Sequence, residues 1–518
     1  MKKIFILFLS FYCITISSQD GILDTSFSDD GKFFLNTVFN YPNNSTEYIL
    51  DLLEQSDGKT VYLGNSYSSS GFFEPMYCNV FRLNANGTLD PSFGKGGIFQ
   101  YSTDQYNTNL FLTASKLMML EDGSFLIAGY GRDSTYLSAD IIVIKITPNG
   151  VLDTTFGVNG IARFAIGGSN NKGVSSMIVY NNKIYIAGKI DQDSFILSAN
   201  LDGSFNTDFN SDGKIILDID GNTNTIAKLE IINNKIYAFG SNFSETSSAN
   251  YYVFVSAINL DGSTASYGTD GTSQFYYGTS SPSILKVFTK TNNKLLLLIS
   301  GNLYMINKYG NIDTTFGTSG KILNPYNQNF YNCAVSKDES YFMTSAKMIG
   351  QNSNQMAFRT VKIKNDFTID NSFGTNGEVI TNVSDPKYNE QFPTRILATS
   401  DGKIIVAGSI TYIPNPNVPS IQNQDYVILR YNNTLNLSAE EITQSEITIY
   451  PNPAKDILTF KTTEKIRKAE IYDLNGRLVK VELGISNNQI DVSSLKTGTY
   501  VIKVTSDKKY HQTKFIKQ

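Results

Sequence analysis

Residues 152–160 read Leu-Asp-Thr-Thr-Phe-Gly-Val-Asn-Gly, and recognisable copies of this stretch recur along most of the chain. Each clear copy has an apolar residue, Asp, any residue, Ser or Thr, and then Phe, with Gly soon after. The clear copies begin at Leu23, Leu89, Leu152, Ile312 and Ile369. Two eroded copies lie at Phe205–Gly213 and Tyr267–Gly271. Counted by their aromatic residue, the copies number seven: Phe27, Phe93, Phe156, Phe209, Tyr267, Phe316 and Phe373.

The length and composition favour a repeat array rich in β-structure. At 518 residues the chain exceeds what one ordinary hydrophobic core supports, so several domains or an array are expected. The seven copies favour the array. Charged residues make up 17% and aromatic residues 12% of the chain, and amphipathic helical spacing is scarce. This profile is typical of strands joined by many turns.

Each interval between copies contains four strand-length apolar segments. In the third interval they are residues 161–166, 174–180, 183–188 and 195–201. The second and third segments are joined by Asp-Gly or Asn-Asn, for which we expect two-residue turns with positive φ. The sixth interval has Lys337–Ser340 instead, so we expect a longer connection there. Such hairpins require antiparallel neighbours, which predicts an all-β fold: a seven-bladed β-propeller of four-stranded antiparallel blades over residues 20–436.

The repeated stretch itself is best explained as structural. Its Asp can accept hydrogen bonds from nearby backbone amides and fix a tight turn between blades. Its aromatic residue would fill the space between adjacent blades. A catalytic role would require one privileged copy, whereas the Asp recurs in most units, so we assign no catalytic residue. The aspartates are Asp24, Asp90, Asp153, Asp313 and Asp370.

The two ends of the chain differ from its middle. Residues 1–19 have a basic start, a short apolar run and a small-residue exit, which predicts a secretory signal peptide cleaved near Ser18 to Asp20, with no lipid anchor. No later run is long and apolar enough for a membrane span. Residues 437–445 are polar and acidic and are expected to be a linker. Residues 446–518 then show short alternating segments, which predict a small β-sandwich.

Two resemblances follow from these motifs. The repeated stretch, with a downstream Gly-Lys-Ile and an Ala-Gly pair, resembles the delta-60 repeat family of β-propellers, which implies architecture but no activity. Tyr450–Ala454, Ile471–Arg477, Leu495–Tyr500 and Lys514–Lys517 resemble the C-terminal sorting domain of type IX secretion cargo. That resemblance implies interaction with the type IX secretion machinery through residues 446–518. It also implies passage through the periplasm, removal of the domain, and release or attachment at the cell surface.

The inventory of reactive residues excludes several classes of enzyme. The chain has one histidine, His511, and it lies in the C-terminal segment. A Ser-His-Asp triad, a Cys-His dyad and a histidine-ligated zinc are therefore excluded from the propeller. After the signal peptide, Cys78 and Cys333 remain, far apart in the array, so we expect buried free thiols. The region before Ser445 carries an excess of acidic residues, which disfavours nucleic acid as a partner.

Calcium is the one cofactor for which the sequence offers a candidate site. Asp208, Asn210 and Asp212 alternate and precede Gly213, a spacing that places oxygen ligands around Ca²⁺. The position where an EF-hand has its last acidic ligand is Ile219, and the segment coincides with a copy of the repeated stretch. A plain turn is therefore the alternative. Residues 29–31, Asp-Asp-Gly, are a weaker relative.

Three functions are consistent with these observations. The leading hypothesis is a secreted or cell-surface propeller that binds a glycan or a surface protein without catalysis. The alternative is a surface carbohydrate-active hydrolase or lyase that uses carboxylates on one propeller face. A structural envelope component is the third.

Overall fold

The computed structural model describes most of the chain after residue 19. The described residues are 20–37, 45–68, 77–102, 110–133, 139–169, 171–244, 250–290, 293–349, 355–383, 388–412, 423–434, 448–462, 466–473, 478–483, 485, 488–506 and 510–518. The expected signal peptide (1–19) and the expected linker (437–445) lie outside them. The chain divides into two compact units, Met1–Leu435 and Asn436–Gln518.

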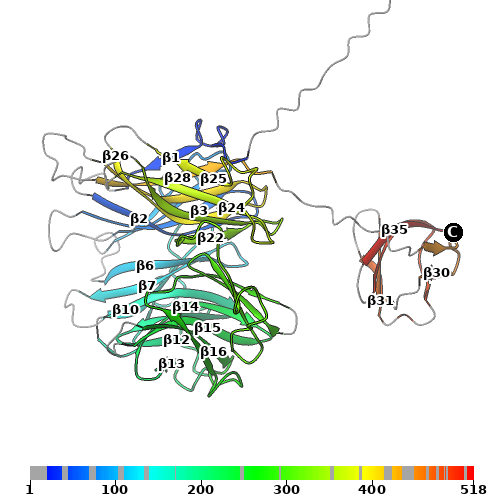
Figure 1. Ribbon diagram of the computed structural model, residues 1–518, viewed down its shortest axis with the longest axis horizontal. Helices are drawn as coiled ribbons and strands as arrows, with labels where there is room; N and C mark the ends of the chain where they lie inside the picture. The colour runs from blue at the N-terminus through cyan, green and yellow to red at the C-terminus, as the bar shows by residue number, and fades with distance from the viewer. Residues whose placement is uncertain are drawn as a thin grey trace, which may run out of the picture. The chain divides into compact units, whose positions relative to one another are not determined.

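The described residues of the first unit form seven four-stranded antiparallel sheets, here called blades (Figure 1). Blade 1 contains β2 (Ser45–Glu54), β3 (Thr60–Ser68), β4 (Tyr77–Leu83) and β5 (Ile98–Tyr101). Blade 2 contains β6 (Leu110–Met119), β7 (Phe125–Asp133), β8 (Ala139–Ile146) and β9 (Ile161–Phe164). Blade 3 contains β10 (Lys172–Tyr180), β11 (Lys183–Ile190), β12 (Asp193–Asn200) and β13 (Lys214–Leu217).

The remaining four blades follow the same plan. Blade 4 contains β14 (Thr223–Ile232), β15 (Lys235–Ser244), β16 (Asn250–Asn259) and β17 (Thr272–Gly278). Blade 5 contains β18 (Ile284–Thr289), β19 (Leu295–Ile299), β20 (Asn302–Ile306) and β21 (Lys321–Ile322). Blade 6 contains β22 (Asn332–Val335), β23 (Tyr341–Met348), β24 (Met356–Ile363) and β25 (Glu378–Thr381). Blade 7 contains β26 (Tyr388–Ala398), β27 (Ile404–Tyr412), β28 (Asn423–Tyr431) and β1 (Lys32–Leu35).

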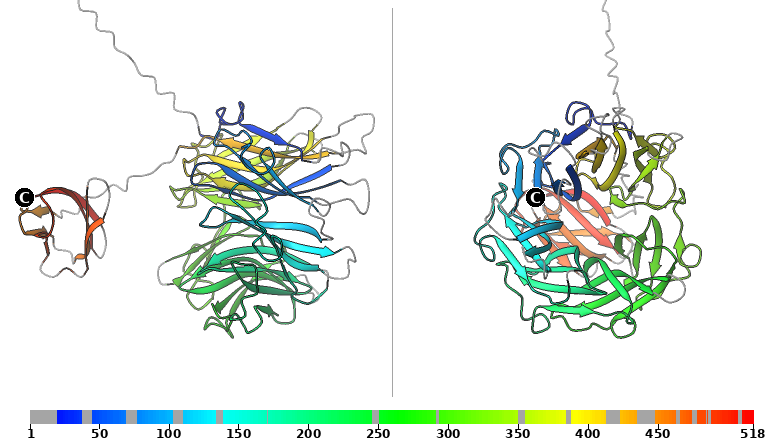
Figure 2. Two further views of the ribbon diagram at one scale, coloured as in Figure 1. Left: turned by 180° about the vertical axis from the view of Figure 1, so that it is seen from behind. Right: turned by 90° about the vertical axis from the view of Figure 1, so that its left-hand side faces the viewer.

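The blades close into a ring around a central axis. The first strands, β2, β6, β10, β14, β18, β22 and β26, contact one another in that order, and β26 returns to β2. Figure 2 shows the same arrangement, with the strands running in chain order around the ring from blue through green to yellow. Hydrophobic clusters fill the interface between each pair of consecutive blades. The all-β propeller prediction is confirmed.

The sequence repeat and the blade are out of phase by one strand. Residues 161–164 open the third repeat interval, yet they pair with β8 and form the outer strand of blade 2. Because of this offset, β1, the strand that opens the first repeat interval, has no preceding blade in the sequence. It pairs with β28 at the end of the propeller, Lys32 opposite Leu429, so the two ends of the array share blade 7. The ring is therefore closed by backbone hydrogen bonds as well as by packing.

The turns between the first two strands of a blade are of two kinds. Asn181 and Asn182 both have positive φ and form the expected two-residue turn, as do the two residues between β14 and β15. The Asp-Gly turns are longer: the Gln55 amide donates to the Lys59 carbonyl, and only Gly58 has positive φ. The expectation of two positive φ values there was wrong, because the loop holds five residues. The sixth turn has the same length, not a longer one, with Glu339 in the positive-φ position.

A β-bulge shapes the first strand of most blades. The register shifts within six of the first strands, once in five of them, for example between Ala114 and Lys116 in β6, and twice in β26. The bulge brings the Thr113 carbonyl close to Gly129, where an added Cβ would lie 2.1 Å from that oxygen. The glycines of blades 3, 4 and 7 face the same approach. The glycine of the second strand in these blades is therefore required by the bulge beside it.

The second unit contains two antiparallel sheets, as expected for a small sandwich. One contains β29 (Thr448–Tyr450), β30 (Ile457–Lys461) and β33 (Gln489–Asp491). The other contains β32 (Leu478–Leu483), β31 (Ile466–Tyr472), β34 (Gly498–Ser506) and β35 (Tyr510–Lys517). Leu458, Ile471, Ile502 and Phe515 belong to its buried core. This unit has its own core, which is the requirement for an independent domain.

Two further predictions concern single features. Cys78 and Cys333 are free and buried, as expected. Among the described residues, none belongs to a helix that could span a membrane.

Candidate functional site

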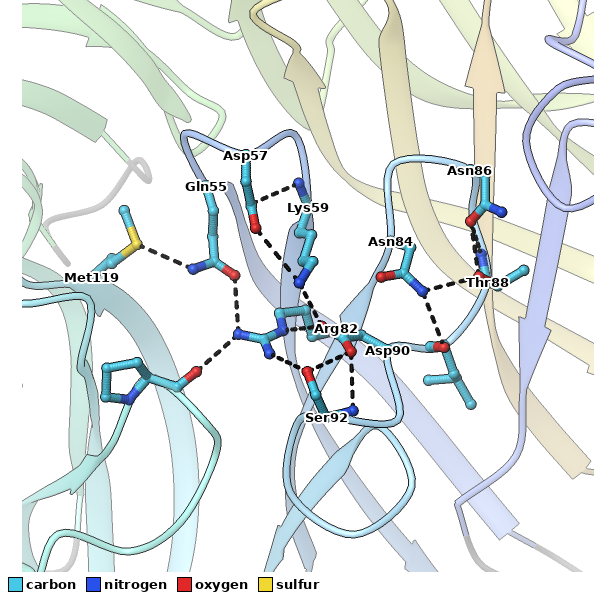
Figure 3. A network of polar contacts seen from close by, with 12 residues as sticks. Gln55, Asp57, Lys59, Arg82, Asn84, Asn86, Thr88, Asp90, Ser92 and Met119 are labelled. Atoms are coloured by element: carbon cyan, nitrogen blue, oxygen red, sulfur yellow. Dashed lines mark hydrogen bonds and ion pairs between the residues drawn. The ribbon is translucent and has the colours of Figure 1, made fainter.

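The Asp of the repeated stretch lies in a compact polar cluster between two blades. At the second copy, Asp90 Oδ1 accepts hydrogen bonds from the amide and the hydroxyl of Ser92, at 3.0 and 2.7 Å. Its Oδ2 pairs with Arg82 Nε at 2.8 Å and with Lys59 Nζ at 3.0 Å (Figure 3). The Arg82 guanidinium lies 4.7 Å from the centre of the Phe93 ring. Burial raises the pKa of Asp90, but the bonds from Ser92 and Lys59 outweigh it and hold the pKa below its usual range.

The same cluster recurs wherever the acid is retained. Asp24 pairs with Arg430 at 2.9 Å, Asp153 with Lys145 at 3.1 Å, and Asp370 with Lys362 at 3.1 Å. In each case the cation lies at the position whose carbonyl accepts the Asp amide. At the fifth blade that position is Met305, and Lys294 supplies the cation; its hydrogen bond lowers the pKa of Asp313 to about 2.

The two eroded copies lose the acid and the cation together. Asn206 stands in place of the Asp, and Ser198 stands in place of the cation; the Asn206 amide group donates to the Ser198 hydroxyl at 3.0 Å. In the next copy both positions are alanine, Ala265 and Ala257. A buried charge without a partner is costly, which explains why these copies lose both groups, and why Lys294 supplies the cation where Asp313 is retained opposite Met305. The aspartates are therefore committed to structure.

The residues after the Asp link each blade to the next. An added Cβ on Gly87 would lie 2.7 Å from the Phe27 ring, and one on Gly150 would lie 2.8 Å from the Phe93 ring. The Gly94 amide donates to the Asn149 carbonyl across the same interface. Between blades 6 and 7 the Gly374 amide donates to the carbonyl of Asp20, which occupies the place of Asn149. The prediction that the stretch fixes inter-blade turns is confirmed by these bonds.

The residues of the calcium candidate occupy one such turn. Asp208, Asn210 and Asp212 are exposed. The Asn210 side chain donates to the Lys214 carbonyl at 2.8 Å, and Asp212 Oδ1 accepts the Lys214 amide at 3.2 Å. Among the described residues, no group of three or more His, Cys, Asp or Glu side chains is arranged to hold a metal. The calcium loop stays a prediction.

A ring of equivalent positions on the first strands forms a second, unforeseen cluster. In six blades the position directly follows the bulge; in β22 it is fixed by the pairing of Asn332 with Thr344. In every blade the residue at this position pairs with the equivalent residue of the second strand. The seven residues therefore lie at one level around the axis. They are Asp51, Lys116, Ser176, Lys228, Lys286, Asn332 and Arg395. We call this set the central ring.

The three short side chains of the central ring brace neighbouring blades. Asp51 Oδ2 accepts the Leu117 amide of blade 2 at 3.1 Å, and Ser176 Oγ accepts the Leu229 amide of blade 4 at 3.0 Å. The Asn332 side chain donates to the Thr394 carbonyl of blade 7 at 3.4 Å. These contacts stabilise the inner edge of the propeller.

The four long side chains are cations that lie close enough to influence one another. Burial lowers the pKa of Lys116, and the charges of Arg395 and Lys228 lower it further. Burial also lowers the pKa of Lys286, again with Lys228 adding to the effect. Asp51 opposes the shift at both lysines and at Arg395. A cluster of partly buried cations around the axis is suited to hold an anion.

A buried acid lies at the closure of the ring. Glu47 of β2 is fully buried, and its Oε1 accepts hydrogen bonds from the amide and the hydroxyl of Thr37, both at 2.6 Å. Burial raises the pKa of Glu47 to about 8, and Asp425 contributes in the same direction. Asn79, Ser66 and Tyr426 extend this polar network.

Comparison with family models assigns the two units. A model described as a secretion system C-terminal sorting domain matches residues 448–518. The C-terminal unit is a type IX secretion sorting domain. The sorting domain directs the protein to the cell surface or the extracellular space, and it is the part that engages the secretion machinery. A second model, described as a β-propeller domain of unknown function, matches residues 55–93 in blade 1.

Comparison with whole proteins adds little. No curated protein matches the chain. Solved structures similar to it include the hemagglutinin-neuraminidase ectodomain of parainfluenza virus 5, at 8% identity over 78% of this chain and 84% of that chain, with a TM-score of 0.35. A GH43 protein from Bacillus licheniformis, BlXynB, is 11% identical over 66% and 87%, with a TM-score of 0.28. The extracellular domain of BT4673 from B. thetaiotaomicron is 10% identical over 91% and 92%, with a TM-score of 0.20. Scores this low carry no functional argument.

Proposed function

We propose that the protein is a non-enzymatic binding protein of the cell surface or the extracellular space, in which the propeller binds and the sorting domain serves export. The observation that carries this proposal is the use of the carboxylates. The repeated aspartates are held by Ser or Thr and by a cation in each retained copy. The polar side chains at the axis are mainly cations, which suit recognition better than general acid–base chemistry.

One observation supports the hydrolase or lyase alternative. A general acid in glycoside cleavage needs a raised pKa, and a second carboxylate nearby. Glu47 has the first property, because burial raises its pKa to about 8 and the charge of Asp425 adds to the rise. Its complete burial counts against access by a polysaccharide. We therefore rank this function second.

An assay of the secreted protein against a panel of neutral and acidic polysaccharides separates the two functions. We expect binding without release of reducing ends or unsaturated products. Turnover that a single carboxylate substitution such as Glu47→Gln abolishes would establish the enzyme instead. If neither binding nor turnover is found with glycans or with surface proteins, the protein is a structural envelope component.

A further inference from the structure

We propose that the four cations of the central ring, Lys116, Lys228, Lys286 and Arg395, form a binding site for an oxyanion group of an acidic saccharide, either a carboxylate or a sulfate ester. This inference rests on the proposed binding function and names its site and ligand class. It is drawn from the position of the ring, the contacts of its members and their charge.

The contacts within the central ring show that Lys116 and Lys286 are not needed as braces, whereas Lys228 pairs with Glu230 at 3.2 Å and Arg395 Nη1 donates to the adjacent Thr394 carbonyl at 2.8 Å. Asp51, Ser176 and Asn332 each bond to the backbone of the neighbouring blade, which is a structural task. Among the described residues, Lys116 and Lys286 make no such bond and no ion pair, although they occupy the same position. A short polar side chain would fill the structural role in those blades as well. These two lysines therefore serve another purpose.

At this level of the axis the cations outnumber the carboxylates. The four cations come from blades 2, 4, 5 and 7, so they surround the axis rather than line one side of it. The carboxylates acting on them are Asp51, which is committed to blade 2, and Glu230, which pairs with Lys228 at 3.2 Å. Like charges that act on one another in a partly buried site repel. An anion between them would remove that repulsion.

The chemistry of the side chains fits an oxyanion. The planar guanidinium of Arg395 presents paired donors that match carboxylate or sulfate geometry, and lysines add mobile point charges. The rest of the propeller sequence carries an excess of acidic residues, so an acidic saccharide would be repelled from most of its surface. The central ring would thus attract an anion, whereas the acidic residues elsewhere on the propeller would repel it. This contrast gives specificity.

Binding to the full secreted chain tests the site directly. The probes are tri-galacturonate, which carries only carboxylates, a carrageenan oligosaccharide, which carries only sulfates, and neutral cellotriose. Calorimetry at low ionic strength should show binding of at least one anionic probe and none of cellotriose. We expect Lys116→Met and Lys286→Met each to weaken that binding at least tenfold and Arg395→Lys to weaken it less. Which anionic probe binds decides between the two sources of the oxyanion.

The matched control is Lys364→Met, because Lys364 is an exposed lysine of an outer turn. It should leave binding unchanged. The ring variants remove mutually repelling charges, so their Tm should equal or exceed that of the wild type. The inference is overturned if no anionic probe binds, or if the ring variants bind as the wild type does. Binding of cellotriose that the ring variants do not affect would overturn it while leaving the proposed binding function intact, whereas turnover of a probe would overturn the proposed function.

Discussion

At the residue scale, Glu47 should make the stability of the propeller depend on pH. An acid whose pKa is raised by folding holds its proton more tightly when folded, so the free energy of unfolding falls as pH rises from about 4.5 to about 8. A shift of this size corresponds to a loss on the order of 5 kcal/mol over that window. Glu47→Gln keeps a neutral side chain at all pH values and should flatten the curve of Tm against pH.

The control for this experiment is Glu121→Gln, which changes an exposed acid in a turn. It should leave the pH dependence of the wild type in place. A Glu47→Gln protein whose Tm still falls between pH 5 and pH 8 as steeply as the wild type would show that the acid is not held neutral by folding.

The proposed calcium loop makes a second prediction at this scale. An ion held by Asp208, Asn210 and Asp212 would stabilise the folded protein by mass action. Calcium should then raise the Tm of the wild type, EGTA should reverse the rise, and Asp212→Ala should abolish it. Asp57→Ala is the matched control, because Asp57 accepts the Lys59 amide as Asp212 accepts that of Lys214. No calcium shift, or an equal shift in Asp212→Ala, removes the site.

At the element scale, the paired loss of charge in the eroded copies predicts how the inter-blade cluster responds to mutation. Asp370→Asn leaves Lys362, whose side chain is fully buried, with Asp20 at 3.9 Å as its nearest carboxylate. We expect a loss of about 3 kcal/mol in the free energy of unfolding. Adding Lys362→Ser recreates the Asn206 and Ser198 pair of the fourth copy and should recover part of the loss. A double variant less stable than the single one would contradict this account.

The β-bulge gives a second prediction for an element. Gly129→Ala would place a methyl group 2.1 Å from the Thr113 carbonyl oxygen, and should cost about 2 kcal/mol or more because backbone must move. Gly173→Ala is the control: Gly173 lies in the first strand of blade 3, where an added Cβ meets nothing within 4 Å. Equal Tm values for the two variants, measured by thermal unfolding, would show that the bulge tolerates a side chain.

The sequence predicted the elements better than their pairing. Alternating apolar residues and turn residues are local signals, so the strands and hairpins could be read from them. The assignment of residues 161–164 to the preceding blade is set by hydrogen bonds to β8, which no local pattern records. The central ring was missed for a similar reason. A lysine such as Lys116, followed by Leu117 within an apolar strand, is equally typical of a solvent-facing position, and only the closed ring brings the four cations together.

At the scale of the whole molecule, the seam between the two ends of the array should control the stability of the ring. The Asp20-Gly21 turn occupies, between blades 6 and 7, the place that Asn149-Gly150 occupies between blades 1 and 2. The Gly21 amide also donates to the Asn432 carbonyl, and the Thr434 amide donates to Asp20 Oδ1. With β1, these contacts hold the start of the propeller against its end, so damage here opens the ring rather than one blade.

Gly21→Ala tests this closure. Gly21 has a φ of +83°, and an added Cβ would lie 2.6 Å from the Gly374 amide nitrogen of blade 6, which would push the N-terminal segment out of its place at the seam. Gly96→Ala is the matched control, with a φ of +64° and nothing within 4 Å, so it carries the cost of the left-handed backbone, about 1 kcal/mol, without the clash. We expect the larger fall in Tm for Gly21→Ala, with hydrogen exchange accelerated in β1 and β28 but not in β10–β13. Equal Tm losses, or hydrogen exchange accelerated evenly over the blades, would mean that the seam is no weaker than any other interface. In a ring closed by packing alone, all seven interfaces would share the strain.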